Sequence, residues 1–250
     1  MRSQVLSALL GLIFTVRCFG APACNVGTVF DHAPKSSHDF SSLLQKAEHG
    51  DLTAQFQVGL AYETGAGVEQ EYSAAVRWYR KAGESGNPAA QNNLASLYAR
   101  GLGLPRSDNE AMKWYLRAAV EGFPAAQNNV GFMYAAGRGV PQSDAAAVSW
   151  YRKAAAKRYA PAESNLGVMY LQGRGVAADT MRAAKLFRAA AKIGDAAAEY
   201  NLGLLYYTGN GHRRDLGEAL KWFRAAAKRG SVEAQNQISA GIPSEASSLQ

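Results

Sequence analysis

A repeat of 36 residues runs through most of this 250-residue chain and limits the folds open to it. Five glycines and one arginine share one phase of the period: Gly50, Gly86, Gly122, Arg158, Gly194 and Gly230. An alanine follows four residues after each of these six markers, and a tyrosine follows twelve residues after the first five. Because the spacing never drifts, the chain is expected to fold as a stack of equal units without insertions.

Each unit reads as two amphipathic helices joined by a short turn. At 100° per residue, the repeating alanine and tyrosine of the first half fall on one apolar stripe, and a Trp–aromatic pair with two alanines forms the stripe of the second half. A glycine pair separates the halves, as in Gly137 and Gly139. The first glycine of each pair suits a helix C-cap, and Pro124 suits the first turn of the next unit.

The pattern therefore predicts an all-α fold, an α/α solenoid of five 36-residue helix-turn-helix repeats. The expected repeats are 51–86, 87–122, 123–158, 159–194 and 195–230. Residues 39–50 are expected to form a capping helix at the front, and residues 231–240 a capping helix at the back. Residues 24–38 are predicted to be a flexible segment and residues 241–250 a flexible tail.

The repeat resembles the Sel1-like repeat, a relative of the tetratricopeptide repeat. The best match is the run Ala126–Tyr134, followed by Gly137–Val140, Ala147 and Trp150–Ala155. The resemblance implies a right-handed superhelix that binds a protein or peptide, without naming the partner. Repeat four departs from the pattern, since Leu186 stands where the other repeats have tryptophan.

The N-terminus reads as a secretory signal peptide over residues 1–23. Arg2 precedes the mostly apolar run Val5–Val16, which is too short to span a bilayer. Cleavage after Gly20 or Ala23 would leave Cys24 as the single cysteine of the mature chain, either a spectator thiol, an intermolecular partner or a lipid attachment site. We expect an exported protein, in the periplasm, the cell envelope or the medium, with no transmembrane span in the mature chain.

Composition excludes several classes of protein. The chain has 27 Lys and Arg against 20 Asp and Glu, a formal net charge of +7, and two of these arginines lie in the predicted leader. This mild excess falls short of a nucleic-acid-binding arm, so no nucleic-acid partner is expected. Two cysteines rule out a disulfide scaffold and a cysteine-based zinc site, and the sequence predicts no metal and no cofactor.

A partner is expected to bind the face of each first helix that lies opposite its apolar stripe, which lines the concave groove in tetratricopeptide-like arrays. One position of this face repeats an amide, including Asn93, Asn129, Asn165 and Asn201. A row of amides offers donors and acceptors to an extended peptide backbone. The alternative is that these amides bond to neighbouring helices or loop carbonyls and serve only the fold.

Other positions of the groove change from repeat to repeat, as a selective surface requires. Apolar side chains become more frequent toward the C-terminus, which predicts an apolar peptide site centred on Phe132, Leu171, Tyr200, Leu204 and Tyr207. The alternative is that curvature buries them within the array.

The opposite, outer face of the second helices is basic. It is either a solvated face that keeps the array soluble or a ridge for phosphate or lipid. The sequence places no aromatic residue among these cations, which argues against single-strand stacking.

No catalytic machinery is recognisable in the sequence. The Gly-x-Gly pairs never continue to the third glycine of a nucleotide-binding fingerprint, and the Gly-x-Ser-x-Gly, His-Glu-x-x-His and Ser-x-x-Lys motifs are absent. We therefore predict a non-enzymatic scaffold for a protein or peptide partner. The alternatives are a cell-wall- or β-lactam-active enzyme, like some secreted relatives, and a module that binds anionic ligands on its basic outer face.

Overall fold

The computed structural model describes residue 34, residues 36–211 and residues 213–241, and these contain helices and turns but no strand. The predicted signal peptide lies outside the described residues, as do most of the predicted flexible segment and nearly all of the tail. The twelve described helices are α2 (Ser37–Glu48), α3 (Leu52–Thr64), α4 (Tyr72–Glu84), α5 (Pro88–Arg100), α6 (Asp108–Val120), α7 (Pro124–Ala136), α8 (Asp144–Ala156), α9 (Ala160–Gln172), α10 (Thr180–Lys192), α11 (Ala196–Thr208), α12 (Leu216–Lys228) and α13 (Val232–Ser239).

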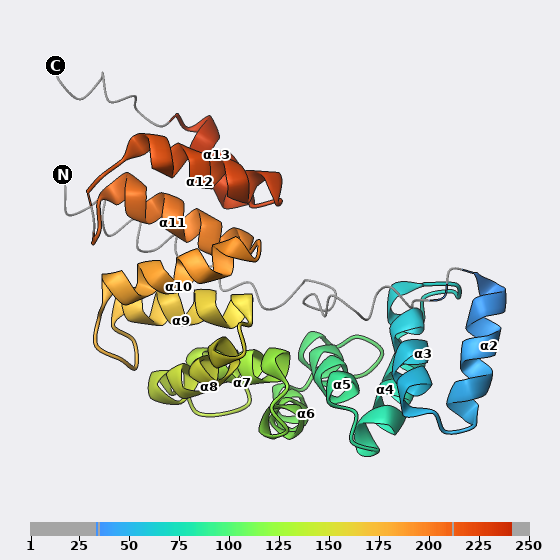
Figure 1. Ribbon diagram of the computed structural model, residues 1–250. Coiled ribbons are helices and arrows are strands. Elements are labelled where there is room, and N and C mark those ends of the chain that lie inside the picture. The colour runs from blue at the N-terminus through green and yellow to red at the C-terminus, as the bar shows by residue number, and fades with distance from the viewer. Residues whose placement is uncertain (1–33, 35, 212, 242–250) are drawn as a thin grey trace. The chain divides into compact units, whose positions relative to one another are not determined.

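The helices are grouped in two compact units, one ending at Ser143 and one beginning at Asp144. The N-terminal unit holds α2–α7 and the C-terminal unit holds α8–α13, so that the third repeat contributes one helix to each (Figure 1). Within each unit successive helices pack on one another as hairpins. The prediction of an all-α stack of five helix-turn-helix repeats is confirmed.

The ends of the helices lie where capping chemistry places them. The Asp51 side chain accepts from the Ala54 N–H at 2.8 Å at the start of α3, and Ser107 caps α6 through the Glu110 N–H. Gly65 ends α3 in the left-handed region with φ 77°, a conformation that glycine adopts without strain because it has no Cβ. Arg158, at the step where the sequence lacks its marker glycine, adopts the same left-handed region with φ 60°.

In the hairpins α3–α4, α9–α10 and α11–α12, an aromatic ring of the second helix lies against a glycine of the first. The hairpin α5–α6 has Ala95 at the equivalent position. A Cβ built on Gly203 of α11 would lie 2.5 Å from the ring of Phe223 in α12. The same overlap arises between Gly59 and Tyr79 and between Gly167 and Phe187. The three rings are fully buried, so the missing Cβ lets the two helices approach closely enough to enclose them.

Successive repeats are joined where the glycine-pair loop of one repeat meets the second helix of the repeat before it. A Cβ on Gly139 would overlap the carbonyl of Asp108 at the start of α6. Beside it Arg138 forms a two-pronged ion pair with the Asp108 carboxylate, and its Nε–Oδ2 distance is 3.0 Å. Arg174 forms the same two-pronged ion pair with Asp144 one repeat later. These pairs hold the loop on the neighbouring helix.

We expect Gly203→Ala to destabilise the C-terminal unit by about 1–3 kcal/mol, because the added methyl group must displace the enclosed Phe223 ring. The matched control is Gly217→Ala in α12, an exposed position where the nearest atom to a new Cβ lies 3.4 Å away. That change should be neutral or stabilise the helix by up to about 1 kcal/mol. Urea unfolding followed by circular dichroism measures both, and equal effects would refute the packing argument.

A buried glutamine joins three of the first helices, α3, α5 and α7, to the end of the preceding second helix. Gln55, Gln91 and Gln127 each donate from Nε2 to the carbonyl eight residues earlier, at 3.2, 2.9 and 3.1 Å. In α9 and α11 the same position is Glu163 and Glu199, both only 4% exposed. A carboxylate has no N–H to donate, so these two repeats lack the hydrogen bond to the carbonyl eight residues earlier.

The two glutamates have arginine partners instead. Arg158 Nε lies 3.5 Å from Oε1 of Glu163, and Arg229 Nε lies 3.1 Å from Oε1 of Glu199. Burial raises the pKa of Glu163 against the opposing charge of Arg158, and the nearby Asp195 raises it further. Burial also raises the pKa of Asp195, although the Ala198 N–H and the Ser164 hydroxyl bind its carboxylate. The C-terminal unit thus holds two carboxyls with raised pKa values, Glu163 and Asp195.

A carboxyl whose pKa is higher in the folded state than in the unfolded state binds its proton more readily when folded. The C-terminal unit should therefore gain stability as pH falls through the raised pKa values, until the unfolded carboxyls are protonated as well. Glu163→Gln should restore the hydrogen bond from the side-chain amide to the preceding second helix and stabilise this unit by about 1 kcal/mol at neutral pH. It should also reduce the increase in stability as the pH falls. Unfolding midpoints against pH test this, with the exposed loop variant Glu69→Gln as control. A destabilised Glu163→Gln would contradict it.

Candidate functional site

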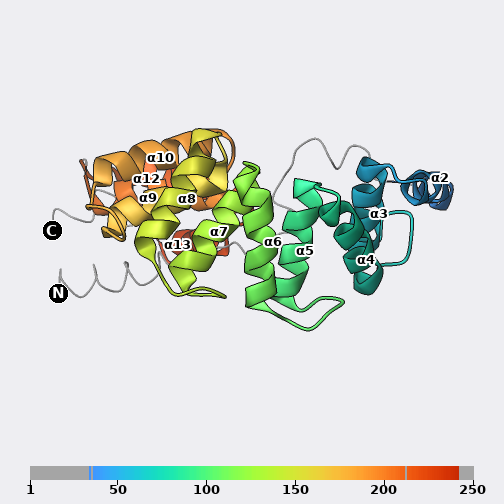
Figure 2. The ribbon, with the colours of Figure 1, turned by 90° about the horizontal axis from the view of Figure 1, so that it is seen from below.

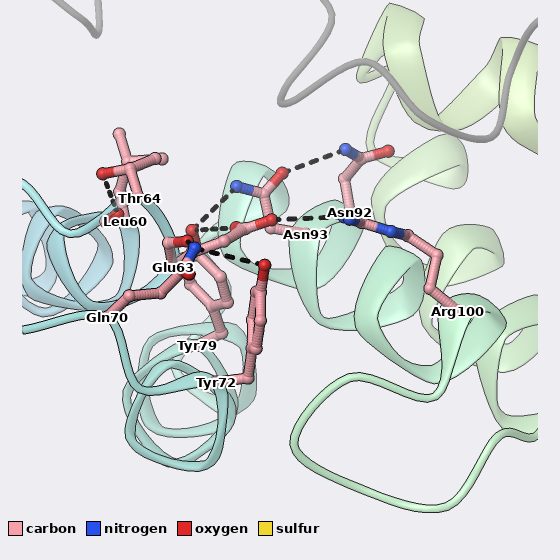
Figure 3. A network of polar contacts seen from close by, with 9 residues as sticks. All are labelled: Leu60, Glu63, Thr64, Gln70, Tyr72, Tyr79, Asn92, Asn93 and Arg100. Carbon is pink, nitrogen blue, oxygen red and sulfur yellow. Dashed lines mark hydrogen bonds and ion pairs between the residues drawn. The ribbon is translucent and has the colours of Figure 1, made fainter.

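Four side chains of the N-terminal unit meet on the face of its first helices that the sequence assigns to a groove (Figure 3). The Tyr79 hydroxyl of α4 donates to Oε2 of Glu63 in α3 at 2.7 Å, and Asn93 of α5 donates from Nδ2 to the Tyr79 oxygen at 3.1 Å. Arg100, at the end of α5, lies 3.6 Å from Oε1 of Glu63. We call Glu63, Tyr79, Asn93 and Arg100 the Glu63 cluster.

The Glu63 cluster is largely withdrawn from water. The side chains of Glu63 and Arg100 are 11% and 29% exposed, and Tyr79 is fully buried. Burial raises the pKa of Glu63, opposed by the Tyr79 hydrogen bond and the Arg100 charge. Burial, with the Glu63 charge beside it, raises the pKa of Tyr79 well above its ordinary value. Tyr79 therefore keeps its proton near neutral pH and acts as a hydrogen-bond donor.

The polar chain continues from the cluster into the next repeat. Asn92 donates from Nδ2 to Oδ1 of Asn93 at 3.3 Å, and Asn129 of α7 donates to Oδ1 of Asn92 at 3.0 Å. At the other end Gln70 donates to the Glu63 carbonyl at 2.6 Å (Figure 3). Side-chain contacts thus run from α3 through α4 and α5 to α7, along one face of this unit.

The predicted amide row divides into members with different surroundings. Asn93 is buried and Asn129 half-buried, and both are hydrogen-bonded inside the array, as the structural alternative in the sequence requires. In the C-terminal unit Asn165 is half-buried and Asn201 is buried, 6% exposed. At Asn93 and Asn129 the amides serve to join neighbouring helices, whatever else they bind.

The predicted apolar positions are partly enclosed. Tyr200 and Leu204 are 8% and 4% exposed and belong to a core with Phe223, whose ring centroid lies 5.5 Å from that of Tyr200. The expectation that these two line an open surface is wrong, because α12 and α13 cover them. Phe132, Leu171 and Tyr207 are half-buried and keep part of their surface exposed.

The sequence did not indicate the Glu63 cluster. Tyr79 occupies the aromatic position that packs in every repeat, so nothing marked its hydroxyl as a bridge. Glu63 and Arg100 do occupy adjacent groove positions of successive repeats, with opposite charges. A comparison of neighbouring repeats at these two positions could therefore have predicted their ion pair.

No group of three or more potential metal ligands occurs among the described residues. Within the same residues, no helix is long and apolar enough to cross a membrane.

Five copies of one family model, described as Sel1 repeat, match residues 52–87, 88–122, 124–159, 160–195 and 196–231. The chain belongs to the Sel1 repeat family. The matches cover most of the chain and follow the repeat that the sequence shows by itself. Sel1 repeat proteins are generally scaffolds for protein interactions.

Solved structures support the assignment. A Sel1 repeat protein from Oxalobacter formigenes is 33% identical with a TM-score of 0.74, over 80% of each chain. A protective antigen of uropathogenic Escherichia coli with an SLR fold is 31% identical with a TM-score of 0.68, over 80% of this chain. The match spans only 43% of that antigen's length. An immunity protein from Pseudomonas aeruginosa, 18% identical with a TM-score of 0.54 over 80% and 78% of the two chains, shares the fold. No curated protein matches.

We expect Tyr79→Phe to destabilise the N-terminal unit by about 1–3 kcal/mol, because it leaves the buried Glu63 carboxylate and the Asn93 amide each without one partner. Tyr98→Phe is the matched control, since it removes a hydroxyl bonded only to the exposed Arg80 at the protein surface. That loss should cost at most about 0.5 kcal/mol. Chemical unfolding compares the two, and equal losses would show that the cluster does not stabilise this unit.

Proposed function

We propose that this Sel1 repeat protein is an exported, non-enzymatic scaffold that holds a protein or peptide on the groove face of its first helices. The observation that carries the proposal is the contrast between two kinds of position on this face. Positions that repeat are engaged in packing or in hydrogen bonds between helices. Among the positions that differ between repeats, Tyr200 and Leu204 are buried, whereas others keep some surface exposed: Ser96, Arg100, Phe132, Leu171 and Tyr207 are half-buried.

The chemistry of this face differs between the two units. In the N-terminal unit the side chains are mainly polar, with Arg100 at the edge of the Glu63 cluster. In the C-terminal unit the partly exposed side chains include Leu171 and Tyr207, and the Arg214 guanidinium lies 5.7 Å from the Tyr207 ring centroid. An aromatic ring with a nearby arginine is a frequent anchor for a protein partner. We infer that the apolar part of the partner contacts the C-terminal unit.

The Glu63 cluster supports the non-enzymatic part of the proposal. A buried carboxyl with a raised pKa is also a feature of catalytic acids. Here, however, one oxygen of Glu63 accepts from Tyr79 and the other faces Arg100, so both are engaged within the fold. Hydrolysis of a chromogenic β-lactam by the purified protein, lost in Glu63→Gln, would favour the enzyme alternative.

Export and the periplasmic, envelope or extracellular location are part of the same proposal. They are supported by the leader pattern of residues 1–23, with its arginine, its short apolar run and its small residues before Cys24.

The double variant Leu171→Ala, Tyr207→Ala should lose a specific partner in a crosslinking capture from the source cells and their medium. Both side chains are only half-buried, so the array should remain folded, which circular dichroism checks. The control is Val120→Ala with Ile193→Ala, which removes side chains 71% and 55% exposed from positions outside the groove face. Capture profiles that are the same for wild type and both variants would exclude this part of the groove face as the binding surface.

A further inference from the structure

The outward faces of α10 and α12 carry the same basic stripe. Residues spaced by four, three and four along a helix lie on one side of it. In α10 these are Met181, Lys185, Arg188 and Lys192, and every one of them is exposed. In α12 the equivalent positions, also exposed, are Gly217, Lys221, Arg224 and Lys228. The buried residues of both helices, such as Phe187 and Phe223, fall outside these stripes.

The two stripes belong to neighbouring helices of the C-terminal unit. At the start of α10, a Cβ on Gly211, in the loop before α12, would lie 2.6 Å from the Thr180 side chain. At the end of α10, the guanidinium of Arg229, just after α12, lies against Gly194. The segments that flank α12 therefore meet the two ends of α10, and α11 packs against both helices (Figures 1 and 2).

Acidic groups are scarce around this pair of stripes. Asp179 and Asp215 cap the helices by accepting from the Arg182 and Glu218 N–H groups. Glu218 is the only acidic residue within either helix, and it pairs with Lys221 at 3.0 Å. Arg188 reaches the Tyr206 hydroxyl at 3.4 Å. Among the described residues, the other four cations of the stripes form no ion pair: Lys185, Lys192, Arg224 and Lys228.

The repeat does not require this charge. At the same outward positions α4 carries Ser73, Arg77, Arg80 and Glu84, and α6 carries Asn109, Lys113, Leu116 and Val120. Those helices pack in the same manner with fewer cations and with a glutamate or a valine in the last turn. The accumulation on α10 and α12 is therefore a property of this surface rather than of the fold.

We propose that the outward surface of α10 and α12, made of Lys185, Arg188, Lys192, Lys221, Arg224 and Lys228, docks on the anionic phospholipid headgroups of a membrane. The proposal is independent of the groove, because it concerns the second helices and their opposite face. Cations seven residues apart are separated by about 10 Å along a helix. Charges spread in this way match a plane of many anionic headgroups better than a single anion.

Two further features favour a bilayer over another polyanion. Met181 is 66% exposed at the N-terminal end of the α10 stripe, four residues before Lys185, where its thioether chain can enter the headgroup layer. Three of the four tryptophans lie on other second helices, where the side chains of Lys81, Arg117 and Lys153 stack on Trp78, Trp114 and Trp150. The fourth, Trp222, is a half-buried residue of α12 outside the stripe positions. On the α10 and α12 stripes no aromatic side chain is available to stack on bases, which disfavours nucleic acid.

The test is cosedimentation of the full chain with phosphatidylcholine vesicles that contain phosphatidylglycerol, and with pure phosphatidylcholine vesicles. The pure vesicles measure any binding by other apolar parts of the chain, so the difference between the two reports the anionic headgroups. We expect tighter binding to the anionic vesicles, weakened by added salt. The triple variant Lys185→Gln, Arg188→Gln, Lys192→Gln should lower this binding by roughly 10-fold or more.

The matched control is Arg77→Gln, Lys81→Gln, Lys113→Gln, which removes the same net charge from exposed positions of α4 and α6. It should change the binding by less than about 3-fold. Equal losses in both triple variants, or no preference of the wild type for anionic vesicles, would overturn the proposal. Circular dichroism of each variant verifies that the helices are intact.

A second variant separates a membrane from a soluble polyanion or an acidic protein. Met181→Ala should weaken binding to anionic vesicles and leave binding to heparin and polyglutamate unchanged. If the wild type binds heparin or polyglutamate more tightly than the vesicles, and Met181→Ala alters neither, the surface serves a soluble anionic partner and the membrane proposal is wrong.

Discussion

The close contact between a helical glycine and a buried aromatic ring is the constraint on which three of the hairpins depend, α3–α4, α9–α10 and α11–α12. Tyr79, Phe187 and Phe223 have room only because Gly59, Gly167 and Gly203 lack a Cβ. The enclosed ring fixes how closely the two helices approach, and hence where both of their other faces point. The other buried positions that recur in the repeats are mostly alanines, so the spacing between helices depends on these small residues and on one large aromatic residue per repeat.

Polar contacts then hold one hairpin to the next at three levels. The side-chain amides of Gln55, Gln91 and Gln127 donate to backbone carbonyls of the preceding second helix. Arg138 and Arg174 form ion pairs with aspartates of the preceding second helix. The Glu63 cluster adds a third connection that occurs in this form only once in the repeated pattern. The glutamine contact is present in three repeats and the Arg–Asp pair in two, whereas Glu63 has no glutamate at the equivalent position of any other repeat.

The repeating part of this architecture could be predicted from the sequence, and the singular part could not. Helix ends, glycine caps and the buried stripes follow from positions that recur, so each repeat verifies the others. A helical wheel also places Tyr200 and Leu204 opposite the stripe that faces their own hairpin. It does not show that α12, the second helix of the same hairpin, packs on that side as well, together with α13 of the next repeat. The same limit concealed the bond from Asn93 to Tyr79, which joins two helices.

The positions that repeat in this chain serve packing, whereas some of those that do not repeat keep part of their surface exposed. On the first helices this separates the bonded amides Asn93 and Asn129 from partly exposed side chains such as Leu171 and Tyr207. On the second helices it separates the enclosed rings from the cations of α10 and α12, which the equivalent faces of α4 and α6 do not match. Both surfaces are positioned by the same glycine–aromatic contacts, since Phe187 and Phe223 orient α10 and α12 against α9 and α11. A chain built in this way can present two chemically different faces while its core stays the same in every repeat.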